Sequence, residues 1–188
     1  VDDNWQKDFD NLMREQRERS KTAAKGSFKG GLGGHSDIHK KYHTATHLMY
    51  KALRMVLGDD VVQRGSNITE ERLRFDFTYP EKVSAEQLVQ VEKIVNEAID
   101  KDYLMTWKEY PTKEALKMGA LGAFGDRYGD SVRVYSAAHE GNEPFSFEIC
   151  GGPHVEHTGQ LGEGGKRFKI IKEEASSAGV RRIKAVLQ

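Results

Sequence analysis

The sequence has little of what would mark a secreted, membrane-bound or strongly charged protein. One cysteine among 188 residues excludes an internal disulfide, and a lone thiol suits the reducing cytoplasm. No apolar run approaches the roughly 20 residues that a membrane-spanning helix needs, and the first residues lack an apolar signal region. With 29 basic and 29 acidic residues, the net charge does not indicate a nucleic-acid partner. We therefore expect a cytoplasmic protein that has no membrane partner.

Basic residues are nevertheless concentrated in two stretches. Residues 13–29 contain six basic and two acidic side chains, and residues 164–188 contain seven basic and two acidic ones. Such stretches can bind the phosphates of a nucleic acid, or they can be charged faces that only contact water. The charge pattern alone leaves both interpretations open.

The first 34 residues form a segment of their own. Residues 4–25 carry apolar side chains at helical spacing, namely Trp5, Phe9, Leu12 and Met13. Five glycines follow in residues 26–34 and predict a flexible joint. We expect a helix and a glycine-rich joint over 1–34 and a single domain over 35–188. Because the chain begins at Val1, we also expect it to be part of a longer protein.

Helices and strands alternate irregularly in the rest of the chain. The 3.6-residue period predicts a helix over Ile38–Leu57, and Ser84 with Gln87 forms a capping box that begins a second helix. A short helix is expected over Lys113–Met118. Strict alternation predicts a strand over Leu73–Tyr79, and further strands are expected at Leu104–Tyr110, Val132–Ala137, Phe145–Ile149, Phe168–Ile171 and Val180–Leu187. This pattern predicts an α+β fold with a mostly antiparallel sheet packed with helices.

Two pairs of residues carry the spacing of metal ligands. His43 and His47 are four apart on the first predicted helix, so their side chains lie one turn apart on one face. Cys150 and His154 are also four apart, and two glycines and a proline between them allow the chain to turn back. Three imidazoles and one thiolate suit Zn²⁺ better than Ca²⁺ or Mg²⁺. His35, His39 and His157 are weaker candidates.

Seven segments of the chain resemble the editing domain of alanyl-tRNA synthetase. They are REQRERSKTAAKGSFKGGL, HTATH, QRGS, RFDF, GALGAFGDRYGDSVRV, CGGPHV and SSAGVRRIKAV, in the order of that family. Pro153 stands where the alanyl-tRNA synthetase family commonly has threonine. The same Gly-Pro-His-Val sequence occurs in the related editing domain of threonyl-tRNA synthetase. The resemblance implies a zinc ion held by His43, His47, Cys150 and His154. It also implies hydrolysis of tRNA for alanine that was wrongly charged with serine or glycine, with Gln63 in the pocket that reads the amino acid.

Other residues are candidates on chemical grounds. Thr44 and Ser66 carry hydroxyls that, with Gln63, could recognise the hydroxyl of serine. Arg74 and Asp76 share the polar face of their strand, where they line the pocket or pair with each other. Four protein ligands are typical of a structural zinc, which has no open position for water. Either one ligand yields its position so that zinc activates water, or zinc only orients the aminoacyl end.

Three alternatives stay open from the sequence. Cys150 could act as a nucleophile beside a histidine. The chain could also be a non-catalytic, zinc-dependent module that binds tRNA. Finally, it could be a free-standing editing protein, although the segment over 1–34 resembles the tether to the tRNA-binding part of a larger synthetase.

Overall fold

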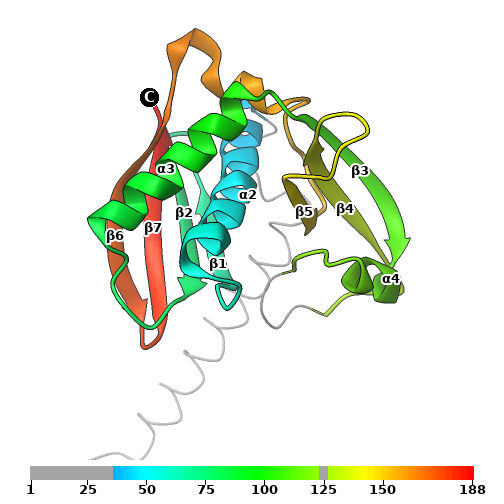
Figure 1. Ribbon diagram of the computed structural model, residues 1–188, viewed down its shortest axis with the longest axis horizontal. Helices are drawn as coiled ribbons and strands as arrows, with labels where there is room; N and C mark the ends of the chain where they lie inside the picture. Colours follow the sequence, from blue (N-terminus) through cyan, green and yellow to red (C-terminus); the bar gives the residue numbers. More distant parts are fainter. Residues whose placement is uncertain (1–35, 123–126) are drawn as a thin grey trace, which may run out of the picture. The chain divides into compact units, whose positions relative to one another are not determined.

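The computed structural model describes residues 36–122 and 127–188, so the predicted helix over 4–25 and the joint over 26–34 lie outside the described residues. Figure 1 shows the described elements. The helices are α2 (Asp37–Leu57), α3 (Ala85–Asp100), α4 (Thr112–Lys117) and the 3₁₀ segment η1 (Thr158–Gly165). The strands are β1 (Gln63–Ile68), β2 (Leu73–Thr78), β3 (Leu104–Pro111), β4 (Ser131–Ala138), β5 (Ser146–Ile149), β6 (Phe168–Ser177) and β7 (Val180–Leu187).

The strands form two antiparallel sheets, and α2 lies between them (Figure 1). One sheet has the order β1-β2-β7-β6 and the other has the order β3-β4-β5. The α+β prediction is therefore confirmed, with two smaller sheets in place of one. No helix in the described part of the chain is long and apolar enough to cross a membrane.

The long helix α2 exists because its sequence supplies both an amphipathic pattern and its ends. The Ser36 side chain accepts a hydrogen bond from the backbone N–H of His39, and Gly58 ends the helix with a positive φ of 108°. The apolar residues of α2 recur about once per helical turn and face the main core. The capping box of Ser84 and Gln87 likewise begins α3, as the sequence predicts.

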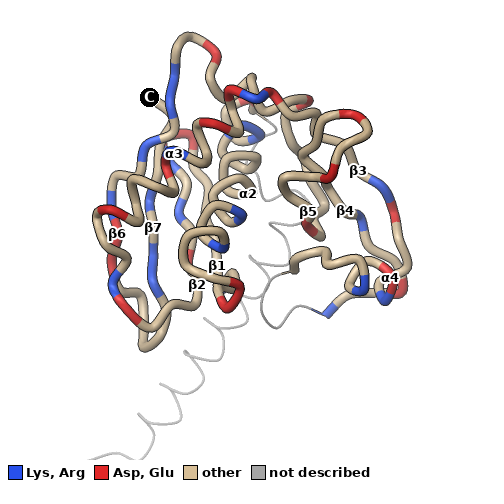
Figure 2. The backbone as a smooth tube through the Cα atoms, in the orientation of Figure 1, with Lys and Arg blue, Asp and Glu red and all other residues tan. Residues whose placement is uncertain are grey.

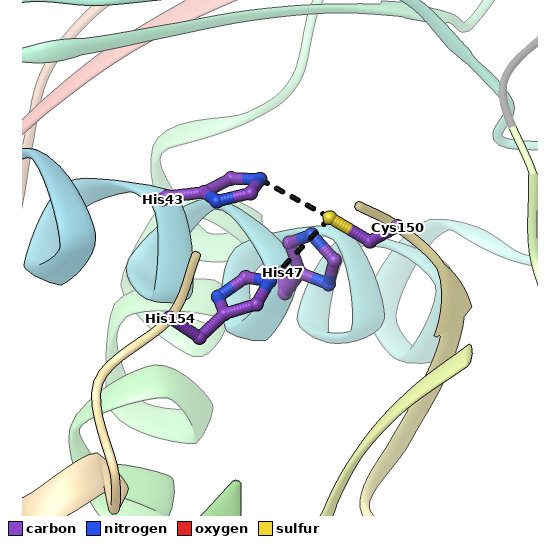
Figure 3. A group of neighbouring side chains, drawn as sticks. All are labelled: His43, His47, Cys150 and His154. Carbon is purple, nitrogen blue, oxygen red and sulfur yellow. Dashed lines mark hydrogen bonds between the residues drawn. The ribbon is translucent and has the colours of Figure 1, made fainter. Parts of the chain in front are cut away.

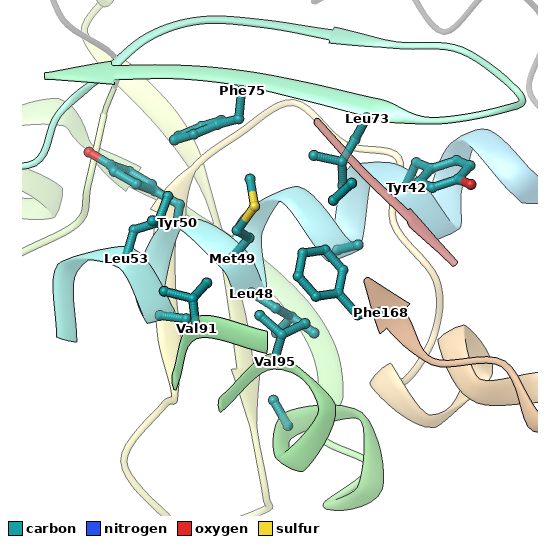
Figure 4. Close-up of a cluster of buried hydrophobic side chains, with 14 of the residues drawn as sticks. Tyr42, Leu48, Met49, Tyr50, Leu53, Leu73, Phe75, Val91, Val95 and Phe168 are labelled. Carbon is teal, nitrogen blue, oxygen red and sulfur yellow. The ribbon is translucent and has the colours of Figure 1, made fainter. Parts of the chain in front are cut away.

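The main core lies between α2, α3 and the inner face of the four-stranded sheet (Figure 4). Leu73, Phe75 and Phe77 alternate along β2 and are fully buried there, as the strict alternation predicts. Leu48 and Met49 of α2 are equally buried. This packing fixes α2 against the sheet, and it thereby fixes the positions of the histidines that α2 carries.

Two described elements are absent from the sequence predictions. The strand β1 has the sequence QRGSNI, which shows no apolar alternation, and it is held by backbone pairing with β2. The segment η1 is rich in glycine, and its only buried residues are Thr158 and Leu161. The strand β6 also runs six residues beyond its predicted end because its polar second half pairs with β7.

Candidate metal centre

The two predicted pairs of ligands meet at one point. Their ligand atoms, from His43, His47, Cys150 and His154, all lie within 4.8 Å of one another, and Figure 3 shows the side chains converging. The helix α2 supplies the first two, and the segment that follows β5 supplies the others. The thiol of Cys150 lies 3.4 Å from Nε2 of His43 and 3.5 Å from Nε2 of His154. Ligand atoms about 2.0–2.3 Å from a tetrahedral zinc are separated by roughly 3.4–3.7 Å, so these residues fit such an ion.

Each imidazole is held through its Nδ1 atom, which leaves Nε2 for the centre. Nδ1 of His43 lies 2.8 Å from the carbonyl oxygen of Pro153, and Nδ1 of His154 lies 3.0 Å from Oγ1 of Thr44. Nδ1 of His47 is paired with the carboxylate of Glu148. Metal-binding histidines are usually oriented in this way, by a carbonyl or a carboxylate on the second ring nitrogen. The arrangement is therefore that of a prepared metal site.

Glu148 is a functional residue that the sequence predictions missed. It is 5% exposed, and one of its carboxylate oxygens, Oε1, has no hydrogen-bond partner among the described residues. Burying a carboxylate is costly unless a charge compensates it, and here His47 does so. The signal was present in the sequence, because Glu148 lies on the strand that leads into the turn and Cys150 follows two residues later, directly after the strand ends.

The electrostatics of the cluster favour a cation. Burial raises the pKa of Cys150, but His47 and hydrogen bonds from His154 and His43 outweigh it and bring this pKa well below its usual value. Burial, together with His43 and His47, lowers the pKa of His154 to about 3. Burial also lowers the pKa of His47, but the charges of Glu148 and Cys150 raise it to about 10. Thiolate and neutral imidazole are the forms that bind metals, so a metal ion would have to displace the proton that the raised pKa of His47 keeps on its ring.

The loop between Cys150 and His154 is shaped by close contact with β4. Gly152 has a positive φ of 69°, and a Cβ atom there would collide with the hydroxyl of Tyr135. The ring of Tyr135 lies edge-on to that of His154, with 4.5 Å between the centroids. A glycine at this position therefore lets the loop lie against β4, and this places the imidazole of His154 over α2.

Thr44 is part of the support of this cluster. It is fully buried, and its hydroxyl contacts His154 and accepts a hydrogen bond of 3.2 Å from the backbone N–H of Val155. Thr46 instead donates a hydrogen bond of 2.8 Å to the carbonyl of Tyr42, one turn earlier on α2. The structure therefore joins Thr44 to the cluster and leaves Thr46 as an ordinary helix residue.

The other candidate residues lie on β1 and β2. Gln63 begins β1, and its backbone N–H donates to the hydroxyl of Tyr50, which follows His47 by three residues on α2. Ser66 is exposed and pairs with Phe75, so it shares the sheet face that packs on α2. Arg74 and Asp76 point to the opposite face, because they alternate with the buried Phe75.

Arg74 and Asp76 form an ion pair with each other. The sequence left open whether they pair or line the pocket. Nη2 of Arg74 lies 3.6 Å from Oδ2 of Asp76. Asp76 also accepts two hydrogen bonds from Arg182 of β7, at 2.8 and 3.0 Å. These contacts join β2 to β7 on the sheet face that lies away from α2.

The other histidines named from the sequence lie apart from the cluster. The ring of His39 contacts the hydroxyl of Ser36, and the ring of His157 contacts the carboxylate of Asp102. Neither belongs to the metal-type group of ligand atoms found in the described ranges. His35 lies outside those ranges.

Comparison with known proteins finds relatives over nearly the whole chain. The family model described as "Threonyl and Alanyl tRNA synthetase second additional domain" matches residues 132–184, which include Cys150 and His154. The chain is 52% identical to the alanine–tRNA ligase of Treponema denticola over 181 residues, 96% of this chain and 29% of that protein. The chain belongs to the alanyl-tRNA synthetase family.

Further members of the alanyl-tRNA synthetase family show the same partial coverage. The alanine–tRNA ligase of Borreliella burgdorferi is 46% identical over 95% of this chain and 29% of its own length. That of Thermus thermophilus is 50% identical over 78% of this chain and 16% of its own length. The chain thus spans less than a third of the curated relatives that it matches, and the resemblance inferred from its motifs is confirmed.

Proposed function

We propose that this chain is the part of an alanyl-tRNA synthetase that hydrolyses tRNA for alanine wrongly charged with serine or glycine. The observation that carries the proposal is the convergence of three imidazoles and one thiol from two distant segments of the chain. The relatives, which are alanine–tRNA ligases, supply the substrate class. A cytoplasmic location would keep Cys150 reduced and available to a metal.

Such a site answers a problem of selectivity. A pocket that accepts alanine cannot exclude the smaller glycine, and it rejects serine by only about 1–3 kcal/mol, so a second, hydrolytic site is the usual remedy. That second site can donate and accept hydrogen bonds with the serine hydroxyl. An alanyl group would leave those polar groups unpaired, which costs about 1–3 kcal/mol when they are buried.

The residues that would hold Zn²⁺ are His43, His47, Cys150 and His154. Zinc, when bound, would supply Lewis-acid chemistry for ester hydrolysis or a fixed point for the aminoacyl end. The chain itself orients the ligands through the carbonyl of Pro153, the carboxylate of Glu148 and the hydroxyl of Thr44. These contacts keep the three Nε2 atoms directed at one point before any ion or substrate arrives.

Gln63 and Ser66 are the residues that we assign to recognition of the serine hydroxyl. Both lie on β1, and Gln63 contacts the turn of α2 that follows His47. Thr44, the third candidate, already uses its hydroxyl for His154 and Val155. Its part is therefore to position the metal ligand.

The test compares two esters in the presence and absence of a chelator. The protein is incubated with seryl- and alanyl-tRNA for the alanine acceptor, and release of the amino acid is measured. We expect seryl-tRNA to be hydrolysed faster than alanyl-tRNA, and we expect chelation or Cys150→Ala to abolish the difference. If neither ester is cleaved faster than in buffer while tRNA still binds, the chain is a binding module and not a hydrolase.

A second candidate uses Cys150 as a nucleophile. The proximity of its thiol to Nε2 of His43 and its lowered pKa favour this chemistry. A nucleophile needs one base, however, whereas three imidazoles surround this thiol, so the metal centre accounts for more of the geometry. Hydrolysis that survives complete removal of metal but is lost on alkylation of Cys150 would favour the nucleophile.

A further inference from the structure

Trp107 is a large aromatic side chain that stays exposed beside the candidate metal centre. It lies on β3, and 47% of its surface is exposed. The guanidinium carbon of Arg133, on β4, lies 3.9 Å from the centroid of its ring. We call these two side chains the Trp107–Arg133 ledge. A single exposed apolar side chain is common on a protein surface, but here a guanidinium group is stacked on the exposed ring.

The ledge continues the sheet face that borders the metal centre. Trp107 pairs with Tyr135, and Met105 pairs with Ala137. Because paired residues share a face, Trp107, Arg133 and Tyr135 lie on one face of the sheet. Met105 and Ala137 lie on the same face, in the part that is buried in the core. The same face therefore runs from the core, past Tyr135 and its contact with His154, to the exposed ledge.

Direct contacts join the ledge to the metal-binding turn. The backbone N–H of Cys150 donates a hydrogen bond of 3.0 Å to the carbonyl of Arg133. The guanidinium of Arg133 donates one of 3.4 Å to the carbonyl of Gly151. A ligand on the ledge would therefore lie next to the turn that presents Cys150.

The charge of Arg133 is available to a ligand. It forms no ion pair within residues 36–122 and 127–188. Glu109 lies opposite Arg133 in the register of β3 and β4, but the two side chains form no ion pair. Most basic residues of the C-terminal stretch are instead neutralised by carboxylates. Figure 2 shows only basic segments on β7, whereas β6 carries both basic and acidic segments. The paired residues are Arg167, Lys172, Arg181, Arg182 and Lys184.

We propose that the Trp107–Arg133 ledge binds the single-stranded 3′ end of an RNA, with a base stacked on the aromatic–guanidinium pair and a phosphate near Arg133. An exposed ring beside an arginine that has no ion pair among the described residues is a combination by which proteins hold single-stranded nucleic acid. The choice of RNA rests on the proposed function, since an aminoacyl ester is carried on the 3′ end of tRNA. The ledge would hold that end while the ester lies at the metal centre.

The experiment measures binding and hydrolysis separately in the full-length protein. Binding of a short, labelled single-stranded RNA without an amino acid is measured by fluorescence anisotropy, for the wild type, Trp107→Ala and Trp107→Phe. Stacking on an aromatic ring is worth about 1–3 kcal/mol per base, so we expect Trp107→Ala to weaken binding by about tenfold or more. Trp107→Phe keeps a ring and should recover most of the affinity.

Arg133→Gln should weaken binding as well, and its salt dependence should become shallower by about 0.7 in the slope of log K against log salt. Leu104→Ala is the matched control, because Leu104 lies on the same strand, is 50% exposed and points to the opposite face. It should bind RNA like the wild type. Thermal unfolding of every variant verifies that the fold is kept.

The outcomes separate this proposal from the proposed function. With seryl-tRNA as substrate, ledge variants should raise KM and leave kcat nearly unchanged. If Trp107→Ala and Arg133→Gln bind RNA as tightly as Leu104→Ala, the ledge proposal is overturned even though seryl-tRNA is still hydrolysed. If they lose RNA binding while the wild type hydrolyses no ester, the ledge stands and the editing function fails.

Discussion

At the scale of single residues, the candidate site depends on the groups that hold Nδ1 of each histidine as much as on the atoms that would bind the metal. Spacing on a helix predicts which imidazoles can share an ion, but it does not predict what orients them. Pro153, Glu148 and Thr44 take that part, from three different segments. Loss of the Glu148 carboxylate or of the Thr44 hydroxyl should weaken metal binding although neither is a ligand, whereas the carbonyl of Pro153 belongs to the backbone.

Glu148→Gln tests the one charged group among these supports. The amide keeps the shape of the side chain but loses the negative charge that faces His47, so we expect the affinity for Zn²⁺ to fall about 10- to 100-fold. Competition with a chromophoric chelator measures this affinity directly. Glu140→Gln, at an exposed carboxylate, is the control and should bind zinc normally. Equal affinities in the two variants would remove Glu148 from the metal centre.

Thr44 and Thr46 form a matched pair on one helix. Both are buried, but only Thr44 touches the cluster. Thr44→Val leaves the backbone N–H of Val155 without its partner, which should cost about 1–3 kcal/mol of stability, and it should also lower zinc affinity. For Thr46→Val we expect zinc affinity to be unchanged. Urea unfolding and zinc titration together check this, and a loss of zinc affinity in both variants would contradict it.

At the scale of helices and strands, predictability from sequence follows from where the stabilising contacts lie. The helices α2 and α3 were predictable because their apolar period and their capping residues are local. The strand β2 was predictable because its alternating residues enter the core. In contrast, β1 and the second half of β6 are polar and depend on backbone pairing with distant strands, which leaves no periodic signal in their own residues.

Pairing across strands also favours a structural role for Asp76. Its carboxylate joins β2 to β7 through Arg182 on the sheet face away from α2, so we expect Asp76→Asn to lower the free energy of unfolding by about 1–3 kcal/mol. Seryl-tRNA hydrolysis at a permissive temperature should be nearly unchanged. The exposed pair of Asp100 and Arg167 is the control, and Asp100→Asn should leave the free energy of unfolding nearly unchanged, because solvent screens an exposed ion pair. Lost hydrolysis at unchanged stability would instead place Asp76 in the reaction.

At the scale of the whole domain, the candidate metal centre adds a polar connection between two parts of the fold that already share the main core through Met105 and Ala137. The helix α2 belongs to the core beneath the four-stranded sheet, whereas Cys150 follows β5 of the three-stranded sheet. An ion bound by both pairs would link the two halves. The spacing of the pairs was readable in the sequence, but their approach across more than 100 residues depends on how both sheets pack on α2.

Removal of the metal should therefore lower the stability of the whole domain. An ion that binds only the folded state stabilises it by about 4 kcal/mol when its free concentration is 1,000 times Kd, which for a domain of this size corresponds to a Tm shift of roughly 10 °C. We expect calorimetry to show this loss after chelation and its recovery when Zn²⁺ is added back. His157→Ala, at a histidine outside the cluster, should keep the shift, because its ring contacts Asp102 and not the four candidate ligands. Cys150→Ala should lose it, since the thiolate is the anionic ligand and the link to β5. A chelated wild type that unfolds at the same temperature as the zinc-loaded protein would mean that the four residues hold no ion that matters to the fold.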